Sequence, residues 1–279
     1  MKIDYDIHAH THLSLCGEDS ATIANYVKSA KRLGIKLIGI ADHMWDLDVP
    51  FAESMSLSKG GIGVLDWYRA QGIEHCRQIL KEIEETDTEG IKFIFGGEVD
   101  YCPGTGAAIT TQHAEQLDFI VVPNSHTHHI MNRDCYKPYQ RHADFMSNAI
   151  MEICTAPTAK YVTSLAHPFE AVSCPYPKEY IYEALTDSRL SEVFSAAKES
   201  NTAVEINSGA FLGMTDDQIR NCGYTRILSA AKKCGCEFTF GSDSHADGEQ
   251  DSLYLAGKAA DFIGLTPEDI LTAEDILRR

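Results

Sequence analysis

The sequence has no long hydrophobic run and comparatively little positive charge. No stretch approaches the roughly 20 apolar residues that cross a bilayer, and residues Met1 to Asp6 lack the apolar segment of a secretory signal. The 24 Lys and Arg residues are outnumbered by 41 Asp and Glu, which gives a formal net charge of -17. Because binding of a polynucleotide needs clustered Lys and Arg, a nucleic-acid partner is disfavoured. We therefore predict a soluble, cytoplasmic protein without a membrane partner.

The chain also lacks a regular cysteine pattern. Its nine cysteines are odd in number and irregularly spaced, unlike the framework of a disulfide-rich secreted domain, so a reduced compartment suits them better. It has no interdomain linker, no low-complexity tract and no internal repeat. Its 279 residues, 44% of them hydrophobic, are enough for one large core. We expect a single domain over residues 1–279.

Short β-branched or aromatic runs alternate with amphipathic stretches along the chain. Seven candidate strands end near His8, Ala41, Gly97, Val122, Ala166, Ile206 and Phe240. Helical patterns occupy residues 22–33, 64–85, 141–154, 180–200, 216–234 and 250–262. This alternation indicates repeated βα units around a parallel sheet. The longest connections, 44–63 and 100–115, are candidate walls of a substrate site.

Histidine and carboxylate residues recur where these strands end. They are His8, His10, Asp42, His43, Glu98, His126, His167, Asp243 and His245. In closed β/α barrels the carboxyl ends of the strands converge and carry the chemistry. His8 and His10 are two residues apart on one strand, so both imidazoles can face one ion. The sequence therefore predicts a cluster of divalent metal ions at these strand ends.

Carboxylates differ in their expected roles. Glu98 follows two glycines, which let backbone or a ligand approach closely. We predict that Glu98 bridges two cations roughly 3.5 to 4 Å apart and leaves a bridging hydroxide facing the substrate. Asp100 is a weaker candidate for the bridge and is expected as a loop or rim carboxylate. Asp42 can orient a metal-bound histidine from behind, and a helix-capping role is an equal alternative for it.

The strand that ends at Val122 leads into three imidazoles, which is more than one metal site requires. His126 is the preferred ligand because it lies nearest the strand end. His128 is an alternative ligand. His129 is expected to contact the substrate or solvent.

Together these motifs resemble the polymerase-and-histidinol-phosphatase (PHP) domain superfamily of metal-dependent phosphoesterases. The similarity covers nearly the whole chain. It rests on Asp6-x-His8-x-His10-Thr11-x-x-Ser14, Asp42-His43, Gly97-Glu98, His126, His167 and Asp243-Ser244-His245. The resemblance implies an α/β fold, a distorted seven-stranded (β/α)7 barrel of TIM-like form, with two or three Zn, Mn or Fe ions.

The resemblance also implies a ligand set for each ion. The first ion would take His8, His10, Glu98 and Asp243, the second Glu98, His126 and His167, and the third His43 and His245. The family usually adds a histidine to the third site, and Cys16 stands in its place here. A thiolate is a good zinc ligand, but a plain buried thiol is an equal alternative for Cys16. His12 is a further alternative ligand.

From this resemblance we expect an enzyme that hydrolyses a small phosphate monoester with the bridging hydroxide. Asp243 would orient the hydroxide, and His245 or His43 would protonate the leaving oxygen. The predicted substrate contacts are His128, Arg133, Lys137, Arg141 and Asn207. Asn207 is included because its strand end resembles one in histidinol-phosphate phosphatases.

Histidinol-phosphate phosphatase of histidine biosynthesis is therefore one substrate-level alternative. A nuclease or nucleotide phosphatase of the same superfamily is a second, although the lack of a basic stripe argues against a polynucleotide. A metal-dependent amidohydrolase would ordinarily show a carbamylated Lys near mid-chain, where this sequence has Glu98. The sequence indicates neither the physiological ester nor the oligomeric state.

Overall fold

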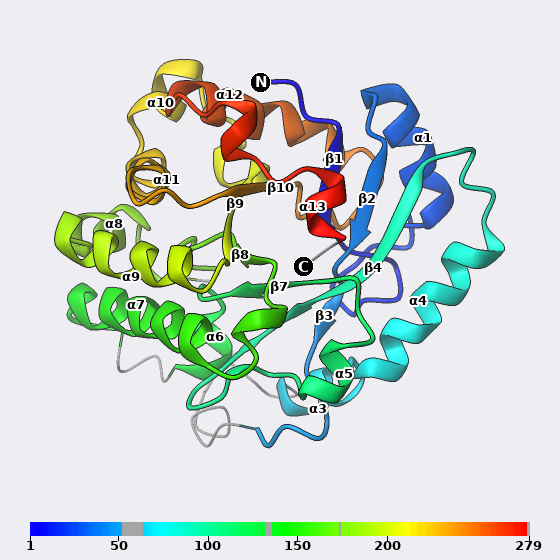
Figure 1. The fold of residues 1–279 in the computed structure, drawn as a ribbon, viewed down its shortest axis with the longest axis horizontal. Coiled ribbons are helices and arrows are strands. Elements are labelled where there is room, and N and C mark those ends of the chain that lie inside the picture. Colours follow the sequence, from blue (N-terminus) through cyan, green and yellow to red (C-terminus); the bar gives the residue numbers. More distant parts are fainter. Residues whose placement is uncertain (52–63, 132–135, 173, 278–279) are drawn as a thin grey trace.

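A sheet of seven parallel strands lies at the centre of the computed structural model, which describes residues 1–51, 64–131, 136–172 and 174–277 (Figure 1). The strand order is β1-β2-β4-β7-β8-β9-β10. Their bounds are β1 (Tyr5–Ala9), β2 (Leu37–Ile40), β4 (Lys92–Val99), β7 (Phe119–Pro123), β8 (Ser164–Ala166), β9 (Ala203–Asn207) and β10 (Phe238–Gly241). All seven predicted strands are confirmed.

The sheet curls until its first and last strands meet. Just beyond β10, the N–H of Asp243 donates to the carbonyl oxygen of His8 at 2.7 Å. The N–H of His10 in turn donates to the carbonyl oxygen of Ser244 at 2.8 Å. These bonds join the two edges of the sheet, so the fold is the nearly closed, distorted seven-stranded barrel that was expected.

Helices surround the barrel (Figure 1). They are α1 (Ile23–Leu33), α3 (Val64–Arg69), α4 (Ile73–Glu85), α5 (Thr111–Ala114), α6 (Thr127–Ile130), α7 (Tyr139–Thr155), α8 (Glu179–Ala184), α9 (Asp187–Glu199), α10 (Asp216–Asn221), α11 (Gly223–Lys233), α12 (Leu253–Phe262) and α13 (Ala273–Ile276). Short 3-10 helices are η2 (Ala159–Tyr161), η3 (Ser208–Phe211), η4 (Glu249–Ser252) and η5 (Pro267–Asp269).

Three predicted helices are each divided into two in the structure: 64–85, 180–200 and 216–234. The first is interrupted before Gly72, whose extended backbone precedes α4. The second is interrupted at Thr186, whose side chain accepts a hydrogen bond from Arg189 N and so begins a new helix. The amphipathic pattern continues across such breaks, which is why periodicity alone did not show them.

Three further strands lie outside the main path of the barrel. The short strand β3 (His43–Met44) pairs with β4 and places His43 opposite Glu98. The predicted connection 100–115 folds as an antiparallel hairpin of β5 (Tyr101–Cys102) and β6 (Gly106–Ala107), followed by α5. Most of the other predicted wall, 44–63, lies outside the described residues.

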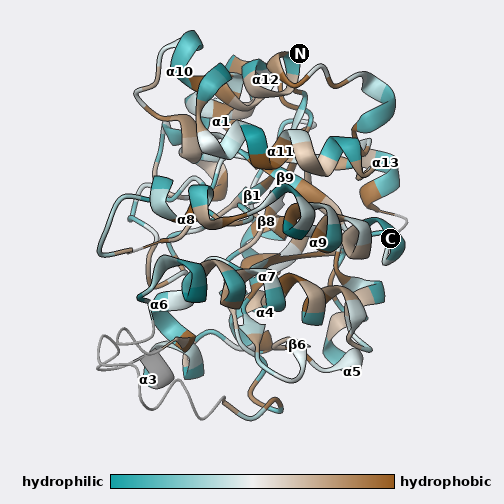
Figure 2. Ribbon diagram, turned by 90° about the vertical axis from the view of Figure 1, so that its left-hand side faces the viewer, coloured by the Kyte–Doolittle hydropathy of each residue, from teal (hydrophilic) through white to brown (hydrophobic). Residues whose placement is uncertain are grey.

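Apolar strands and the inner faces of helices form the core. Phe119 in β7 is buried against Gly39 of β2 and Gly96 of β4, and a Cβ at Gly96 would come within 2.4 Å of its ring. The two glycines therefore leave the space that this ring fills. Helices such as α9 and α11 carry both hydrophilic and hydrophobic stretches (Figure 2). Among the helices of the described ranges, none is long and apolar enough to span a bilayer.

Candidate metal centre

The predicted ligands converge on one cavity of about 380 Å³. It is lined by Cys16, His43, Trp67, Glu98, His126, His128, His129, Val172, Asp243 and His245. His8, His10 and His167 are buried behind the residues that line the cavity, and each of them contacts Glu98 or Asp243. Every residue predicted to bind a metal is thus in one cluster.

Glu98, at the end of β4, is the centre of the cluster and is only 1% exposed. Its Oε1 lies 2.9 Å from His167 Nε2 and 3.5 Å from His126 Nε2. Its Oε2 lies 2.9 Å from His43 Nδ1 and 3.6 Å from Nε2 of His8. The two oxygens therefore face different groups of imidazoles, which is the arrangement a bridging carboxylate needs.

Asp243 contacts part of the same set of imidazoles as Glu98. Its Oδ1 lies 3.1 Å from His10 Nε2 and 3.5 Å from His8 Nε2. Asp243 and His167 both have positive φ angles, 56° and 27°. Non-glycine residues seldom adopt this conformation, and they cluster at functional sites.

The charges of the cluster reinforce one another. Burial by itself would raise the pKa of Glu98, but the imidazoles of His43, His126 and His8 hold this pKa well below its usual range. The pKa of Asp243 is likewise lowered against the effect of burial, first by His8 and then by the hydrogen bond from His10. Both carboxylates are therefore anionic at neutral pH.

Several buried atoms of the cluster have no hydrogen-bond partner among the described residues. They are His8 Nε2, His10 Nδ1, His43 Nδ1 and Glu98 Oε2. An unsatisfied buried polar atom is costly unless a ligand or ion completes it. Lone pairs that face one another across short gaps fit divalent cations, and imidazole with carboxylate is a ligand set of Zn, Mn and Fe.

Four groups of ligand atoms in the cluster are close enough to hold an ion. These groups are His8, His10 and Asp243; His8, Glu98 and His167; His43, Asp100 and His126; and His10, Cys16, His43 and His245. Each predicted metal ligand belongs to at least one of them. The structure thus supports divalent metal binding, with more than one position for an ion.

Outer hydrogen bonds fix the orientation of the imidazoles. Asp100 Oδ1 lies 2.9 Å from His126 Nδ1, and Ser125 Oγ lies 2.7 Å from His167 Nδ1. Asp100 lies in the connection between β4 and β5, as expected of a loop carboxylate, but it is 1% exposed and therefore does not lie at the rim. The carboxylate instead sits behind a predicted ligand, where its charge favours the proton on the adjacent nitrogen, His126 Nδ1, and leaves the lone pair of Nε2 facing Glu98.

Glu205 is a functional candidate that the sequence reasoning missed. Its Oε1 lies 2.8 Å from His8 Nδ1, and both residues are fully buried. The available signal was an acidic residue inside the apolar strand 203–207, which is unusual for a buried strand. Its partner lies 197 positions earlier in the chain, so the contact itself had no local signature.

Asp42 was expected to orient a metal-bound histidine, and its actual contacts are different. It accepts hydrogen bonds from Thr11 N at 2.6 Å and from Thr11 Oγ1 at 2.7 Å, and it contacts His75 Nε2 at 3.1 Å. Its Oδ1 is 4.0 Å from His10 Nδ1, beyond hydrogen-bonding range. Asp42 therefore holds the turn that follows His10 rather than the imidazole itself.

Cys16 lies beside three imidazoles. Burial would raise its pKa, but hydrogen bonds with His10, His245 and His43 lower it to about 3. Its Sγ is also 3.0 Å from Ser14 Oγ. The alternative ligand His12 lies elsewhere, with its Nε2 3.6 Å from Glu82, and it is in none of the four groups.

The predicted substrate contacts are scattered. His128 lines the cavity next to His129, whose Nδ1 lies 2.6 Å from the Tyr68 hydroxyl. Lys137 and Arg141 are exposed and are not among the lining residues. Arg133 lies outside the described residues. Their roles in phosphate binding stay predictions.

Asn207 is buried away from the cavity lining. Its Nδ2 donates to Glu205 Oε2 at 3.2 Å, and its Oδ1 accepts from Gly209 N at 2.9 Å. A contact with substrate stays a prediction for this residue. The residues of the hairpin 100–115 do not contribute to the described lining either.

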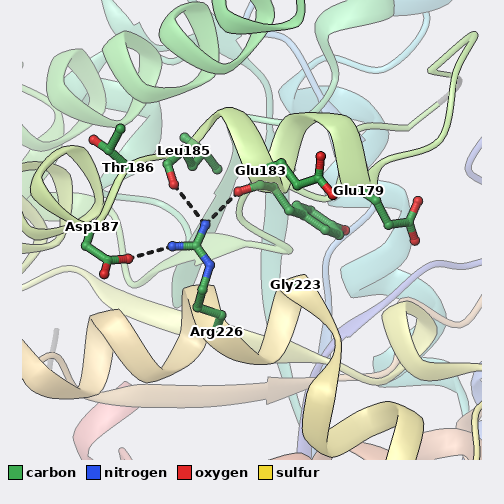
Figure 3. A pocket seen from close by; sticks show the side chains of 8 residues that line it. Glu179, Glu183, Leu185, Thr186, Asp187, Gly223 and Arg226 are labelled. Atoms are coloured by element: carbon green, nitrogen blue, oxygen red, sulfur yellow. Dashed lines mark hydrogen bonds and ion pairs between the residues drawn. The ribbon is translucent and has the colours of Figure 1, made fainter.

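A larger cavity, of about 500 Å³, lies between α8 and α11 (Figure 3). Its Arg226 donates to the Asp187 carboxylate at 2.6 Å and to the carbonyl oxygens of Tyr182 and Leu185. The guanidinium is therefore engaged within the protein. None of the described residues that line this cavity is a histidine or cysteine, so the cavity with the imidazoles is the better candidate site.

Comparisons with known proteins agree with this geometry. The sequence model described as "PHP domain" matches residues 6–263. A protein of Clostridium acetobutylicum named a probable phosphatase is 22% identical over 97% of this chain and 91% of its own length. A probable phosphatase of Shewanella loihica is 29% identical over 88% of this chain and 79% of its own length.

Solved structures show the same fold. A histidinol phosphate phosphatase from Lactococcus lactis, in complex with zinc, L-histidinol and phosphate, superposes with a TM-score of 0.61 at 15% identity. The match covers 94% of both chains. At this identity the likeness establishes the architecture.

Proposed function

The chain belongs to the PHP domain family, and from this membership we propose that it hydrolyses a small phosphate monoester with the help of two or three divalent ions. The observation that carries the proposal is Glu98, a buried carboxylate whose two oxygens face separate imidazole groups. When bound, Zn, Mn or Fe ions supply Lewis acidity toward a phosphoryl oxygen and a hydroxide drawn from solvent. The residues that would hold them are all in the cluster.

The proposed ligands follow the orientation of these side chains. His8, His10, Glu98 and Asp243 would hold a first ion, and Glu98, His126 and His167 a second. The short distances from Glu98 to members of both groups support its role as the bridge. Glu98 and Asp243 together bring two negative charges, which partly balance two dications.

The chain's own residues would orient the reacting groups. Asp243 is partly exposed at the cavity and faces His8 and His10, so its free oxygen can accept a hydrogen bond from the attacking solvent molecule. The Nδ1 of His245 lies 2.8 Å from the carbonyl oxygen of Asp243, so Nδ1 carries the proton and Nε2 is left toward the cavity. Burial would lower the pKa of His245, but the hydrogen bond with Cys16 and the charge of Asp243 raise this pKa to about 9, so Nε2 can carry a second proton. His245 in this form, or His43, is proposed to protonate the leaving oxygen.

A third ion is proposed at Cys16, His43 and His245. The support is their grouping together with His10. A thiolate among imidazoles would favour zinc or another thiophilic cation. If an ion binds here, His43 and His245 would act as ligands and the leaving oxygen would need another proton source.

The residues that line the cavity restrict which substrates it can bind. No Lys or Arg is among the described lining residues, so the phosphate would depend mainly on the ions for charge compensation. Histidinol phosphate is one candidate ester, supported by the fold shared with the Lactococcus lactis enzyme. A nuclease or nucleotide phosphatase is the other candidate, and the net charge of -17 disfavours polynucleotides.

Phosphate release tests the proposal. Protein purified without chelator is incubated with histidinol phosphate, a nucleoside monophosphate and a sugar phosphate, and its metal content is measured in parallel. We expect turnover of at least one monoester that chelation abolishes and added metal restores. Absence of turnover with every class, in protein that carries two ions, would contradict the proposal.

A further inference from the structure

Glu205 makes two contacts that belong to different halves of the metal cluster. It lies in β9, is fully buried, and is opposite Thr239 in the register between β9 and β10. Its Oε1 lies 2.8 Å from His8 Nδ1. Its Oε2 accepts a hydrogen bond from the backbone N–H of His167 at 2.7 Å. One carboxylate therefore touches a proposed ligand of the first ion and a proposed ligand of the second.

The contact with His8 sets which ring nitrogen is available. An ionised carboxylate only accepts hydrogen bonds, so Nδ1 of His8 must carry the proton. The other nitrogen, Nε2, then presents its lone pair 3.6 Å from Glu98 Oε2 and 3.5 Å from Asp243 Oδ1. Reversal of this tautomer would place a proton where the ion is expected.

The contact with His167 acts through the backbone. His167 has a φ of 27°, an unfavourable value for a residue with a side chain. The bond from its N–H to Glu205 holds this turn, and the turn directs His167 Nε2 to within 2.9 Å of Glu98 Oε1. Loss of the bond would release the backbone that aims this imidazole.

Gly241 in the neighbouring strand β10 leaves room for the Glu205 carboxylate because it has no side chain. A Cβ at Gly241 would lie 2.0 Å from Glu205 Oε1 and 2.6 Å from His8 Cβ. Asn207 Nδ2 also donates to Glu205 Oε2 at 3.2 Å, so the carboxylate is held from a third direction. Hydrogen-bonding partners in β1, directly after β8 and in β9 itself therefore fix its position.

We propose that Glu205 is a positioning residue that couples the two ion sites, by selecting the tautomer of His8 and holding the backbone of His167 at once. This inference rests on the proposed metal centre. The role of Glu205 differs from that of Asp100, which among the proposed ligands has a hydrogen bond with His126 only. Replacement of Glu205 should weaken both ions together, and replacement of Asp100 only one.

The test is metal binding, measured by competition with a chromophoric chelator on chelator-treated protein. In Glu205→Gln the amide has one acceptor oxygen and one donor nitrogen, so it cannot accept from both His8 and His167. Loss of a residue that hydrogen-bonds to a metal ligand typically lowers metal affinity by roughly 10- to 100-fold. We expect a loss of that size for both zinc equivalents, with circular dichroism unchanged.

Glu152→Gln is the matched control. Glu152 also accepts one bond from a side chain, the Tyr101 hydroxyl at 2.8 Å, and one from a backbone N–H, that of Gly104 at 2.7 Å. None of these partners belongs to the metal cluster. This variant should bind both ions as the wild type does.

Three outcomes are decisive for Glu205. Unchanged affinity for both ions, or weakening of only one, would overturn the coupling while leaving the proposed function intact. Failure of wild-type protein to bind any zinc would instead overturn the proposed centre. If Glu205→Gln does not fold, Glu205→Asp retains the charge but is too short to reach both partners, and the same loss is expected.

A measurement on the unaltered protein avoids the question of folding. In zinc-loaded protein labelled with 15N-histidine, the inference requires that His8 carries its proton on Nδ1, shielded from solvent exchange, and binds zinc through Nε2. A His8 ring that binds zinc through Nδ1 would overturn it.

Discussion

The Oε2 atom of Glu98 lies 3.6 Å from Nε2 of His8, and neither atom has a hydrogen-bond partner among the described residues. Two ligands that each lie about 2.0 to 2.2 Å from one tetrahedral zinc ion are separated by a similar distance. A cation between them would satisfy both buried atoms. A cation explains this short distance better than packing does, since the Glu98 carboxylate and the lone pair on His8 Nε2 repel each other when nothing lies between them.

Glu98→Gln should abolish most turnover and leave the fold intact. The amide keeps the volume of the side chain but removes the charge and one acceptor that faces the imidazoles. The loss of metal affinity should exceed the roughly 10- to 100-fold that removal of an outer partner costs. Phosphate release and metal stoichiometry check this prediction, with circular dichroism as the control. Near-normal turnover in this variant would remove the proposed mechanism.

Cys16→Ser should remove one metal equivalent if the thiolate is a ligand of the third ion. Cobalt-loaded wild-type protein is then expected to show an ultraviolet sulfur-to-cobalt charge-transfer band that this variant lacks. Cys16→His should lack the band but keep the metal equivalent, because imidazole can replace the thiolate. Cys234→Ser, which alters another partly exposed cysteine, is the control. Unchanged stoichiometry and spectrum in Cys16→Ser would assign Cys16 to packing.

Asp100→Asn should weaken the ion held with His126 and leave the other proposed ion bound as before. The carboxylate lies 2.9 Å from His126 Nδ1 and thereby orients Nε2 toward Glu98. We expect a loss of affinity of roughly 10- to 100-fold for one zinc equivalent. Calorimetric titration distinguishes the two equivalents. Equal weakening of both would mean that Asp100 acts on the whole centre.

His142 should make the free energy of unfolding depend on pH. Burial lowers its pKa from 6.5 to about 4, and its ring nitrogens contact Thr127 Oγ1 and the Tyr176 hydroxyl. Between these values the unfolded chain binds a proton that the folded chain does not, so this contribution to stability is complete above pH 6.5 and is lost as the pH falls toward about 4.

The free energy of unfolding in urea, measured across that range, tests the role of His142. Wild-type protein should lose up to about 2 kcal/mol more than His142→Gln on acidification. The comparison with the variant cancels the contribution of the metal cluster. Parallel pH profiles for the two proteins would show that His142 contributes nothing to the pH dependence.

Gly96→Ala should destabilise the barrel by about 1 to 3 kcal/mol, because the added methyl group overpacks the core. Its Cβ would lie 2.4 Å from the Phe119 ring, which has little room to move. At the adjacent Gly97 the nearest atom to an added Cβ is Met44 Cβ at 3.5 Å, an ordinary contact. Thermal unfolding of Gly97→Ala should therefore show a smaller effect, and an equal effect would contradict the packing argument.

The strands could be predicted from the sequence because most of them are short β-branched or aromatic runs that end next to a polar residue. All seven predicted strands are present. The helix breaks could not be predicted, since they depend on a local change of backbone at Gly72, Thr186 and Cys222 that interrupts neither the apolar periodicity nor the charge pattern. Closure of the barrel was implied by family resemblance and is seen here in two backbone bonds, from Asp243 to His8 and from His10 to Ser244.

Most of the candidate metal-binding residues could be predicted because they lie at or shortly after the ends of strands, where parallel strands bring their ends together. The residues that hydrogen-bond to these side chains and orient them could not be predicted. Glu205 reaches His8 only after β1 closes against β10, and Asp100 reaches His126 only through the pairing of β4 with β7. Both contacts depend on strand register, which leaves no local pattern in the chain.

Titration of metal-free protein tests the central claim most directly. Chelator-treated protein receives increasing equivalents of Zn²⁺ or Mn²⁺ while phosphate release from p-nitrophenyl phosphate is followed. If Glu98 bridges two ions, turnover should be absent without metal and should rise only as the second equivalent binds. Turnover by metal-free protein, or full activity with a single equivalent, would contradict the account.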